Sequence, residues 1–144
     1  MRATPLLAAC ITLFAFASDL HAADPHGIWQ TEGAKAQVRV ADCGGALCGT
    51  IIGLSEPNNP TTGRPKTDEN NADPSKRSRP VIGVQILVAM KPQGPDKWSG
   101  DIYNAEDGKT YSGSFTLVSA TSGKVEGCVL GGLICRGQNW TRVK

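Results

Sequence analysis

The sequence predicts an all-β fold, an eight-stranded antiparallel up-and-down barrel with one long proline-rich loop. Three observations support this prediction. Polar and apolar residues alternate along most of the chain, which is typical of half-buried strands. Turn residues separate the alternating segments, and the chain is rich in Gly (17) and Pro (9). No segment after residue 22 has a clear helical pattern. A two-sheet sandwich has the same periodicity and is the alternative fold.

Length and charge limit the possible functions. The 144 residues are enough for one domain, and 15 Lys and Arg against 13 Asp and Glu give a net charge of +2. This balance argues against a nucleic-acid-binding protein, which would carry a strong basic excess. Nothing in the sequence indicates a cofactor, and it does not define an oligomeric state.

The first 22 residues have the pattern of a signal peptide. Arg2 precedes an apolar run over residues 6–17, which is too short to span a membrane, and Ala22 offers a small residue for cleavage. An N-terminal membrane anchor and a lipoprotein site at Cys10 are the alternatives. We therefore expect residues 23–144 to form a single periplasmic or secreted domain without a membrane span.

Four cysteines remain in the mature chain, as expected for an exported protein with disulfides. Residues 128–135 are symmetric about Gly131-Gly132, a pair suited to a tight hairpin turn, and folding there brings Cys128 opposite Cys135 and Leu130 opposite Leu133. Residues 43–48 close a similar short turn. We expect the disulfides Cys43–Cys48 and Cys128–Cys135. A zinc site made of all four thiolates is the alternative, and its spacing is unusual.

Eight segments have strand character, in the order 27–31, 35–40, 47–54, 81–90, 97–103, 110–118, 124–129 and 133–143. Glycines inside several of them fit the bends of a closed barrel. One connection is much longer than the others: residues 54–80 contain five of the nine prolines. A connection of this length within a compact domain is often functional, and we expect a lid or binding loop.

Several motifs together point to a known family. They are Gly-Ile-Trp at 27–29, Leu-Cys-Gly-Thr-Ile-Ile at 47–52, Asp-Glu-Asn at 68–70, Arg-Ser-Arg-Pro-Val-Ile-Gly at 77–83, Trp-Ser-Gly-Asp-Ile-Tyr-Asn at 98–104, Asp-Gly-Lys-Thr-Tyr at 107–111 and Trp-Thr-Arg at 140–142. In combination, over nearly all of the mature chain, they resemble the uncharacterised bacterial domain-of-unknown-function 2147 family. The resemblance implies an exported, lipocalin-like barrel and no assigned activity.

The motif Gly27-x-Trp29 is also similar to the first-strand signature of lipocalins. In that family the Trp closes the base of the barrel and an Arg near the end of the chain lies over it. The resemblance implies this structural role for Trp29, with Arg142, which follows Trp140, as the cation over the ring. The position of the long loop departs from the family pattern, because lipocalins have their large loop after the first strand and this chain has it after the third.

The best candidate site is a set of polar and aromatic residues in and near the long loop. Arg79 precedes a proline, which favours an extended backbone, and its guanidinium can hold a carboxylate or phosphate. The alternative is that these residues only hold the loop to the barrel rim by hydrogen bonds. The candidate ligand-binding residues are Asp68, Asn70, Arg77, Arg79, Tyr103, Asn104 and Tyr111.

Other patterns in the sequence have ordinary explanations. Residues 68–73 have the oxygen spacing of a calcium loop but lack its Gly and late Glu, so we expect a solvated turn and no metal. Asp101 with Glu106 or Asp107 is a weak candidate for a hydrolase carboxylate pair. We therefore expect a non-enzymatic protein that binds a small, partly apolar ligand at the barrel mouth. The alternative is a cell-envelope module with a solid core that binds protein or peptidoglycan.

Overall fold

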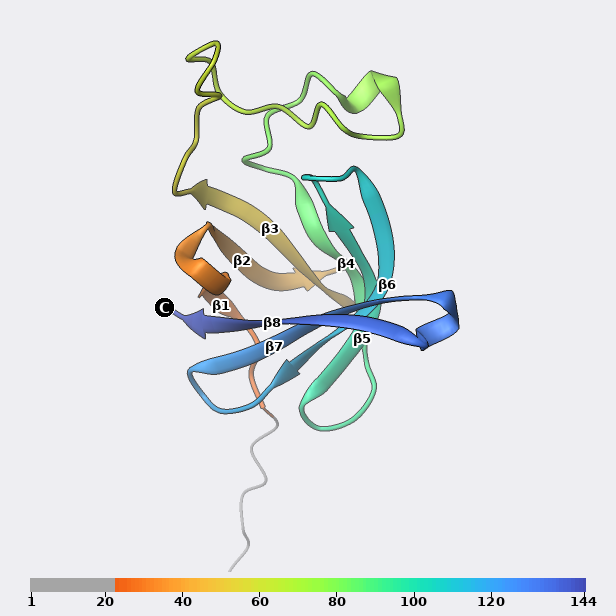
Figure 1. Ribbon diagram of the computed structural model, residues 1–144. Helices are drawn as coiled ribbons and strands as arrows, with labels where there is room; N and C mark the ends of the chain where they lie inside the picture. Colours follow the sequence, from red (N-terminus) through yellow and green to blue (C-terminus); the bar gives the residue numbers. More distant parts are fainter. Residues whose placement is uncertain (1–22) are drawn as a thin grey trace, which may run out of the picture.

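The computed structural model describes residues 23–144 as a closed antiparallel barrel in which each strand pairs with the next and β8 returns to β1 (Figure 1). The predicted barrel is confirmed, and the sandwich alternative is wrong. The predicted signal peptide, residues 1–22, lies outside the described residues. The strands are β1 (Gly27–Gln30), β2 (Ala36–Cys43), β3 (Ala46–Leu54), β4 (Gln85–Pro92), β5 (Lys97–Asn104), β6 (Lys109–Leu117), β7 (Ser122–Val129) and β8 (Ile134–Arg142).

Helical structure is limited to three short 3-10 turns, η1 (Glu32–Ala34), η2 (Pro74–Lys76) and η3 (Leu130–Gly132). Within residues 23–144, no helix has the length and apolar character needed to cross a bilayer.

Polar and apolar residues alternate along the strands, so large apolar side chains point inward and fill the base of the barrel. Phe115 is fully buried at the centre, and its ring centroid lies 5.3 Å from that of Trp29 and 6.1 Å from that of Trp140. Gly123 opposes Trp140 across β7 and β8, and a Cβ on this glycine would lie 2.9 Å from the Phe115 ring. The missing side chain therefore makes room for the ring. The other core residues are Val38, Val40, Leu47, Leu87, Met90, Trp98 and Val125.

Arg142 closes the base of the barrel over Trp29. Its guanidinium carbon lies 4.5 Å from the ring centroid of Trp29, an attractive cation–π contact. The same guanidinium donates hydrogen bonds to the backbone carbonyls of Asp24 and His26, and to that of Ala120 at 2.7 Å. One side chain thus ties the N-terminal segment and the β6–β7 turn to the last strand.

Both predicted disulfides are present. Cys43 and Cys48 have Cα atoms 5.8 Å apart, and Cys128 and Cys135 are a cross-strand pair with Cα atoms 4.1 Å apart. Gly131 and Gly132 both have positive φ, as the turn requires. The strand pairing ends one residue earlier than predicted, at Val129 and Ile134. Leu130 and Leu133 are therefore the outer residues of a turn closed by a 3.3 Å hydrogen bond from the Leu133 N–H to the Leu130 carbonyl.

The strand predicted over residues 81–90 begins later and ends later, at 85–92. Residues 81–84 are rich in β-branched side chains, but Gly83 has φ of +103° and turns the chain before the strand starts. Val84 is 2% exposed and accepts a hydrogen bond from the Ile51 N–H on its backbone oxygen, so its apolar character reflects burial at the end of the loop, before β4 begins. The irregular connection therefore covers residues 55–84.

Candidate functional site

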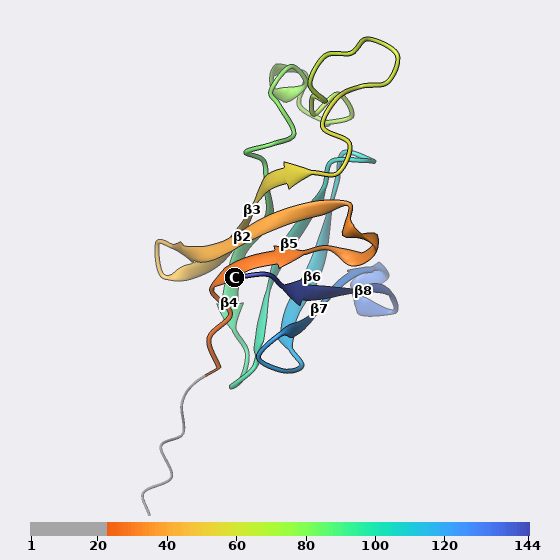
Figure 2. The ribbon, with the colours of Figure 1, turned by 90° about the vertical axis from the view of Figure 1, so that its left-hand side faces the viewer.

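The long loop, residues 55–84, lies over one end of the barrel, above β3, β4 and the β5–β6 turn (Figures 1 and 2). Two isolated bridges, Asn58 with Pro65 and Thr67 with Pro80, fold it back on itself. The 3-10 turn η2 begins after Asp73, whose carboxylate accepts a 3.0 Å hydrogen bond from the Ser75 N–H. The loop is thus an ordered structure with its own hydrogen bonds.

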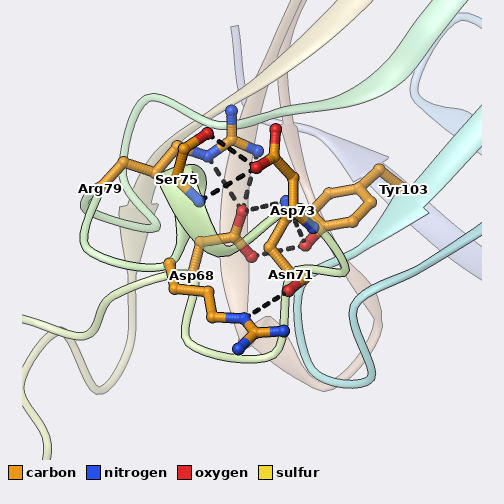
Figure 3. Close-up of polar contacts among 7 residues, drawn as sticks. Asp68, Asn71, Asp73, Ser75, Arg79 and Tyr103 are labelled. Carbon is orange, nitrogen blue, oxygen red and sulfur yellow. Dashed lines mark hydrogen bonds and ion pairs between the residues drawn. The ribbon is translucent and has the colours of Figure 1, made fainter.

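Asp68 is the centre of the contacts between this loop and the barrel (Figure 3). Its side chain is fully buried, and its Oδ2 accepts from Arg79 Nε at 2.9 Å and lies 2.8 Å from Arg79 Nη2. The Oδ1 atom accepts a 2.5 Å hydrogen bond from the hydroxyl of Tyr103 in β5. A buried carboxylate is costly without partners, and here charged and neutral donors satisfy it.

Asn71 completes the cluster. It is 7% exposed, and its Nδ2 donates to Asp68 Oδ2 at 2.8 Å and to the Tyr103 hydroxyl at 3.0 Å. Its Oδ1 accepts from the Asp73 N–H, and its backbone carbonyl accepts a 2.7 Å bond from Arg77 Nε. Asp68, Asn71, Arg79 and Tyr103, which we call the anchor cluster, therefore join both arms of the loop to the barrel wall.

The anchor cluster shifts two pKa values in opposite directions. Burial acts to raise the pKa of Asp68, but hydrogen bonds from Tyr103, Asn71 and Arg79 outweigh it and hold that pKa below its ordinary 3.8. Burial, followed by the hydrogen bond to Asp68, raises the pKa of Tyr103 above its ordinary 10.0. The cluster is therefore ionised at Asp68 and neutral at Tyr103 over a wide pH range.

A pocket of about 340 Å³ lies beside the anchor cluster, which we call the rim pocket. Leu87 and Ile102 pack into the core, so the alternate residues Val88 and Tyr103 face outward and form its floor. The pocket is thus on the outer wall next to the barrel mouth. Its lining comprises Asn71, Ala72, Lys76, Arg79, Gln85, Val88, Tyr103, Gly108 and Thr110.

The structure brings some predicted site residues together and separates others. Asp68, Arg79 and Tyr103 are in direct contact, and Arg77 reaches the same cluster through the Asn71 carbonyl. Asn70 lies at its edge, where Nδ2 donates to the Glu106 carbonyl at 2.9 Å. The ligand-binding role of these residues stays a prediction.

Asn104 and Tyr111 lie outside the rim pocket. Asn104 supports the β5–β6 turn, because its Oδ1 accepts from the Glu106 N–H at 3.0 Å. Tyr111 pairs with Ile102 and shares its inner face, and its hydroxyl donates to the Asp107 carboxylate. These two residues therefore belong to the turn and to the mouth of the barrel.

Several residues of the rim pocket were not among the predicted site residues. Asn71 was detectable, because an Asx side chain three residues after Asp68 suits a turn in which the Asn71 N–H bonds the Asp68 carbonyl at 3.0 Å. Lys76, Gln85 and Thr110 gave no such signal, since only the folded loop brings them to one place.

Groups that could ligate a metal are few. In residues 23–144, three such side chains converge only at Glu126, Cys128 and Cys135, and the disulfide occupies both sulfurs. Asp68, the first oxygen of the calcium-like spacing, faces the guanidinium of Arg79.

Comparisons with known proteins agree with the fold. The family model described as "Uncharacterized protein conserved in bacteria (DUF2147)" matches residues 27–142. Among solved structures, the chain is similar to a protein from the human pathogen Helicobacter pylori, HP1028, described as belonging to the lipocalin family. The two are 24% identical, with a TM-score of 0.72 over 84% of each chain. At this identity the similarity shows the fold alone. A search of curated proteins returned no match.

Proposed function

This chain belongs to the DUF2147 family of bacterial proteins, and from that premise we propose that it is an exported protein that binds a small, partly apolar organic anion in the rim pocket. The rim pocket carries the proposal, because two cations, a tyrosine and an aliphatic floor surround one space of about 340 Å³. A pocket of this volume suits a small organic molecule.

The charge of the pocket favours an anion. Lys76 is exposed, and Arg79 retains donors, because Asp68 engages only its Nε and Nη2 atoms. In residues 23–144, Nη1 of Arg79 has no hydrogen-bond partner. A guanidinium held on one edge presents the rest of its planar fork in a fixed orientation, which suits a carboxylate, sulfonate or phosphate.

The rest of the lining favours an apolar portion in the ligand. Val88, Ala72 and the ring of Tyr103 supply apolar surface, while Gln85 and Thr110 offer neutral hydrogen-bonding groups. The fully buried Asp68 keeps Arg79 in place before a ligand arrives, and this preorganisation lowers the entropic cost of binding.

Two disulfides in a small domain are typical of an oxidising compartment. Together with the signal-like segment at residues 1–22, they support a periplasmic or secreted location.

The protein should act without catalysis. Asp101 shares the outer face of β5 with Tyr103 and is exposed, and Asp107 is engaged by the Tyr111 hydroxyl, so the two do not form an enclosed carboxylate pair. Screening the parent protein and Asp101→Asn against generic esterase and glycosidase substrates checks this point. An activity that is present in the parent and lost in the variant would contradict the expectation of no catalysis.

Native mass spectrometry of protein purified from its own periplasm tests the main proposal by searching for a bound small molecule. Titration with anilinonaphthalene sulfonate, a small aromatic anion, then measures binding in solution. Lys76→Gln and Val88→Glu should each weaken binding at least ~5-fold, because one removes a cation and the other adds an anion. Lys91→Gln, an exposed cation outside the pocket, is the matched control. Equal affinity in all four proteins would refute the assignment.

The alternative, a cell-envelope interaction module, rests on the aromatic packing that fills the base of the barrel. It predicts that the protein recovers envelope protein or peptidoglycan in a pull-down, and that this recovery requires residues 55–84. Equal recovery after deletion of this loop would argue against a loop-centred interface.

A further inference from the structure

The hairpin between β7 and β8 ends in an exposed apolar surface. In residues 23–144, four of the seven exposed large apolar side chains lie on this hairpin, at residues 129–134, which we call the apolar tip. The other three, Ile82, Val118 and Val143, lie outside this hairpin tip, and a few exposed apolar side chains are normal on a protein surface. The exposed fractions at the tip are 40% for Val129, 69% for Leu130, 85% for Leu133 and 54% for Ile134.

The apolar tip projects from the barrel in a constrained shape. Figures 1 and 2 show the β7–β8 hairpin extending to one side, away from the loop of residues 55–84. The Cys128–Cys135 disulfide fixes its two strands immediately behind the tip. Leu130 has φ of +54°, a conformation that is unfavourable for a side chain with a Cβ, yet it is mostly exposed and gains no buried contact in exchange.

The charged side chains of the tip's own hairpin are two cations and one acid. Residues 122–137 contain Lys124, Glu126 and Arg136. Arg136 is exposed and directly follows the disulfide. The carboxylate of Glu126 lies within 4.8 Å of both disulfide sulfurs and pairs with Lys124, with Nζ and Oε2 3.0 Å apart. The hairpin therefore carries a net charge of +1, and within residues 23–144 its Arg136 is in no ion pair.

We propose that the apolar tip inserts into an anionic phospholipid surface, so that the protein docks on a membrane without spanning it. Leucine and isoleucine side chains at a narrow tip fit among acyl chains, and Arg136 can pair with phosphate headgroups. A stable protein interface buries about 800 Å² on each partner with 20–30 residues a side, which is far more than a six-residue tip provides.

Docking through the tip leaves the rim pocket accessible. The loop of residues 55–84 and the apolar tip lie apart in both views (Figures 1 and 2). This inference is independent of ligand binding, because none of the residues that line the rim pocket belongs to the tip.

Vesicle flotation with the disulfide-intact mature protein tests the proposal. Vesicles of phosphatidylglycerol with phosphatidylethanolamine should carry the protein, and phosphatidylcholine vesicles should carry less of it. The double variant Leu130→Ser, Leu133→Ser should bind at least ~10-fold more weakly, because two exposed leucines no longer enter the acyl region. Arg136→Gln should lower the affinity about 5-fold on anionic vesicles only.

Two controls make the result specific. Val118→Ser changes an exposed apolar residue away from the tip and should leave vesicle binding unchanged. Leu133→Trp adds an exposed fluorophore to a protein whose Trp29, Trp98 and Trp140 are buried, so a blue shift on vesicle addition reports insertion of the tip. No flotation of the parent protein, or no blue shift, would overturn the proposal. A vesicle-independent dimer abolished by the double Leu variant would overturn it in favour of a second copy of this chain.

Discussion

Gly108 lies against the backbone of Asn70 so closely that a Cβ on Gly108 would sit 1.7 Å from the Asn70 carbonyl oxygen. This contact joins the β5–β6 turn to the long loop, next to the anchor cluster. Gly108 also has φ of +71°, so two independent constraints require glycine at this position. The loop is therefore positioned by backbone contact as well as by the Asp68 network.

Gly108→Ala should lower the free energy of unfolding by about 2–4 kcal/mol, because the Cβ adds a steric clash to an unfavourable φ. Urea denaturation measures the change. Gly63→Ala is a matched control, since Gly63 has φ of +68° but no atom within 4 Å of its Cβ position, so it should lose only about 1 kcal/mol. Equal losses in the two variants would mean that the contact with Asn70 has no energetic effect.

The anchor cluster should limit stability at both ends of the pH scale. The pKa of Asp68 is lowered in the fold, so its stabilisation is complete above 3.8 and is lost as pH falls through the lower folded pKa. The pKa of Tyr103 is raised, so its contribution is complete below 10.0 and is lost as pH rises through the higher folded pKa. Urea denaturation at a series of pH values should therefore show a plateau between these limits.

Asp68→Asn should reduce the acid-side loss and lower the plateau by about 2 kcal/mol, because an amide NH₂ would face donors that now find a carboxylate. Asp101 is an exposed acid on β5, and Asp101→Asn is the control. It should change neither the loss of stability at acid pH nor the height of the plateau. A pH profile that is the same for the parent and Asp68→Asn would contradict this account.

Arg142→Lys should destabilise the protein by about 1–2 kcal/mol although the charge is kept. A single ammonium cannot cover the Trp29 ring and also reach the carbonyls of His26 and Ala120, which the planar guanidinium does. Thermal unfolding measures the loss, and tryptophan fluorescence reports the environment of Trp29. Arg39→Lys, on an exposed residue of β2, should be neutral. If Arg142→Lys had the stability of the parent protein, a positive charge alone would be sufficient at the base of the barrel.

Each disulfide should contribute only about 2 kcal/mol, because it closes a short loop and removes little entropy from the unfolded chain. Replacing either pair with serines should therefore leave a folded barrel with a lower urea midpoint. Circular dichroism checks the fold. A chain that no longer folds without Cys128–Cys135 would mean that the bridge is needed to form the β7–β8 hairpin.

Local chemistry allowed much of the fold to be predicted. Alternation predicted the strand over residues 110–118, which carries the buried Phe115, and the Gly-Gly pair predicted the hairpin that places Cys128 opposite Cys135. The start of β4 was predicted too early because Val81 and Val84 have strand-like side chains. Their environment depends on contacts with Lys66 and Ile51 that alternation does not reveal.

The candidate site was less predictable, since it depends on the path of one long loop. Asp68 and Tyr103 are 35 residues apart, and only the folded loop places the carboxylate against the hydroxyl. Charge and hydrogen-bonding capacity identified Asp68, Arg79 and Tyr103 as polar partners. Those properties did not distinguish Asn71, which is buried in the cluster, from Asn70 at its edge.

The seam between β1 and β8 has a consequence for the order of folding. Every other strand pairs with its neighbour in the sequence. This seam instead joins the two ends of the domain, at Trp29 with Arg142 and at Gln30 with Thr141, and further backbone hydrogen bonds join Ile28 to residues 143 and 144. Joining such distant residues carries the largest loop-closure entropy in the barrel, so it should be the last step. A chain emerging in sequence order stays an open curled sheet until residues 141 and 142 arrive, and its two unpaired edges are exposed to aggregation until then.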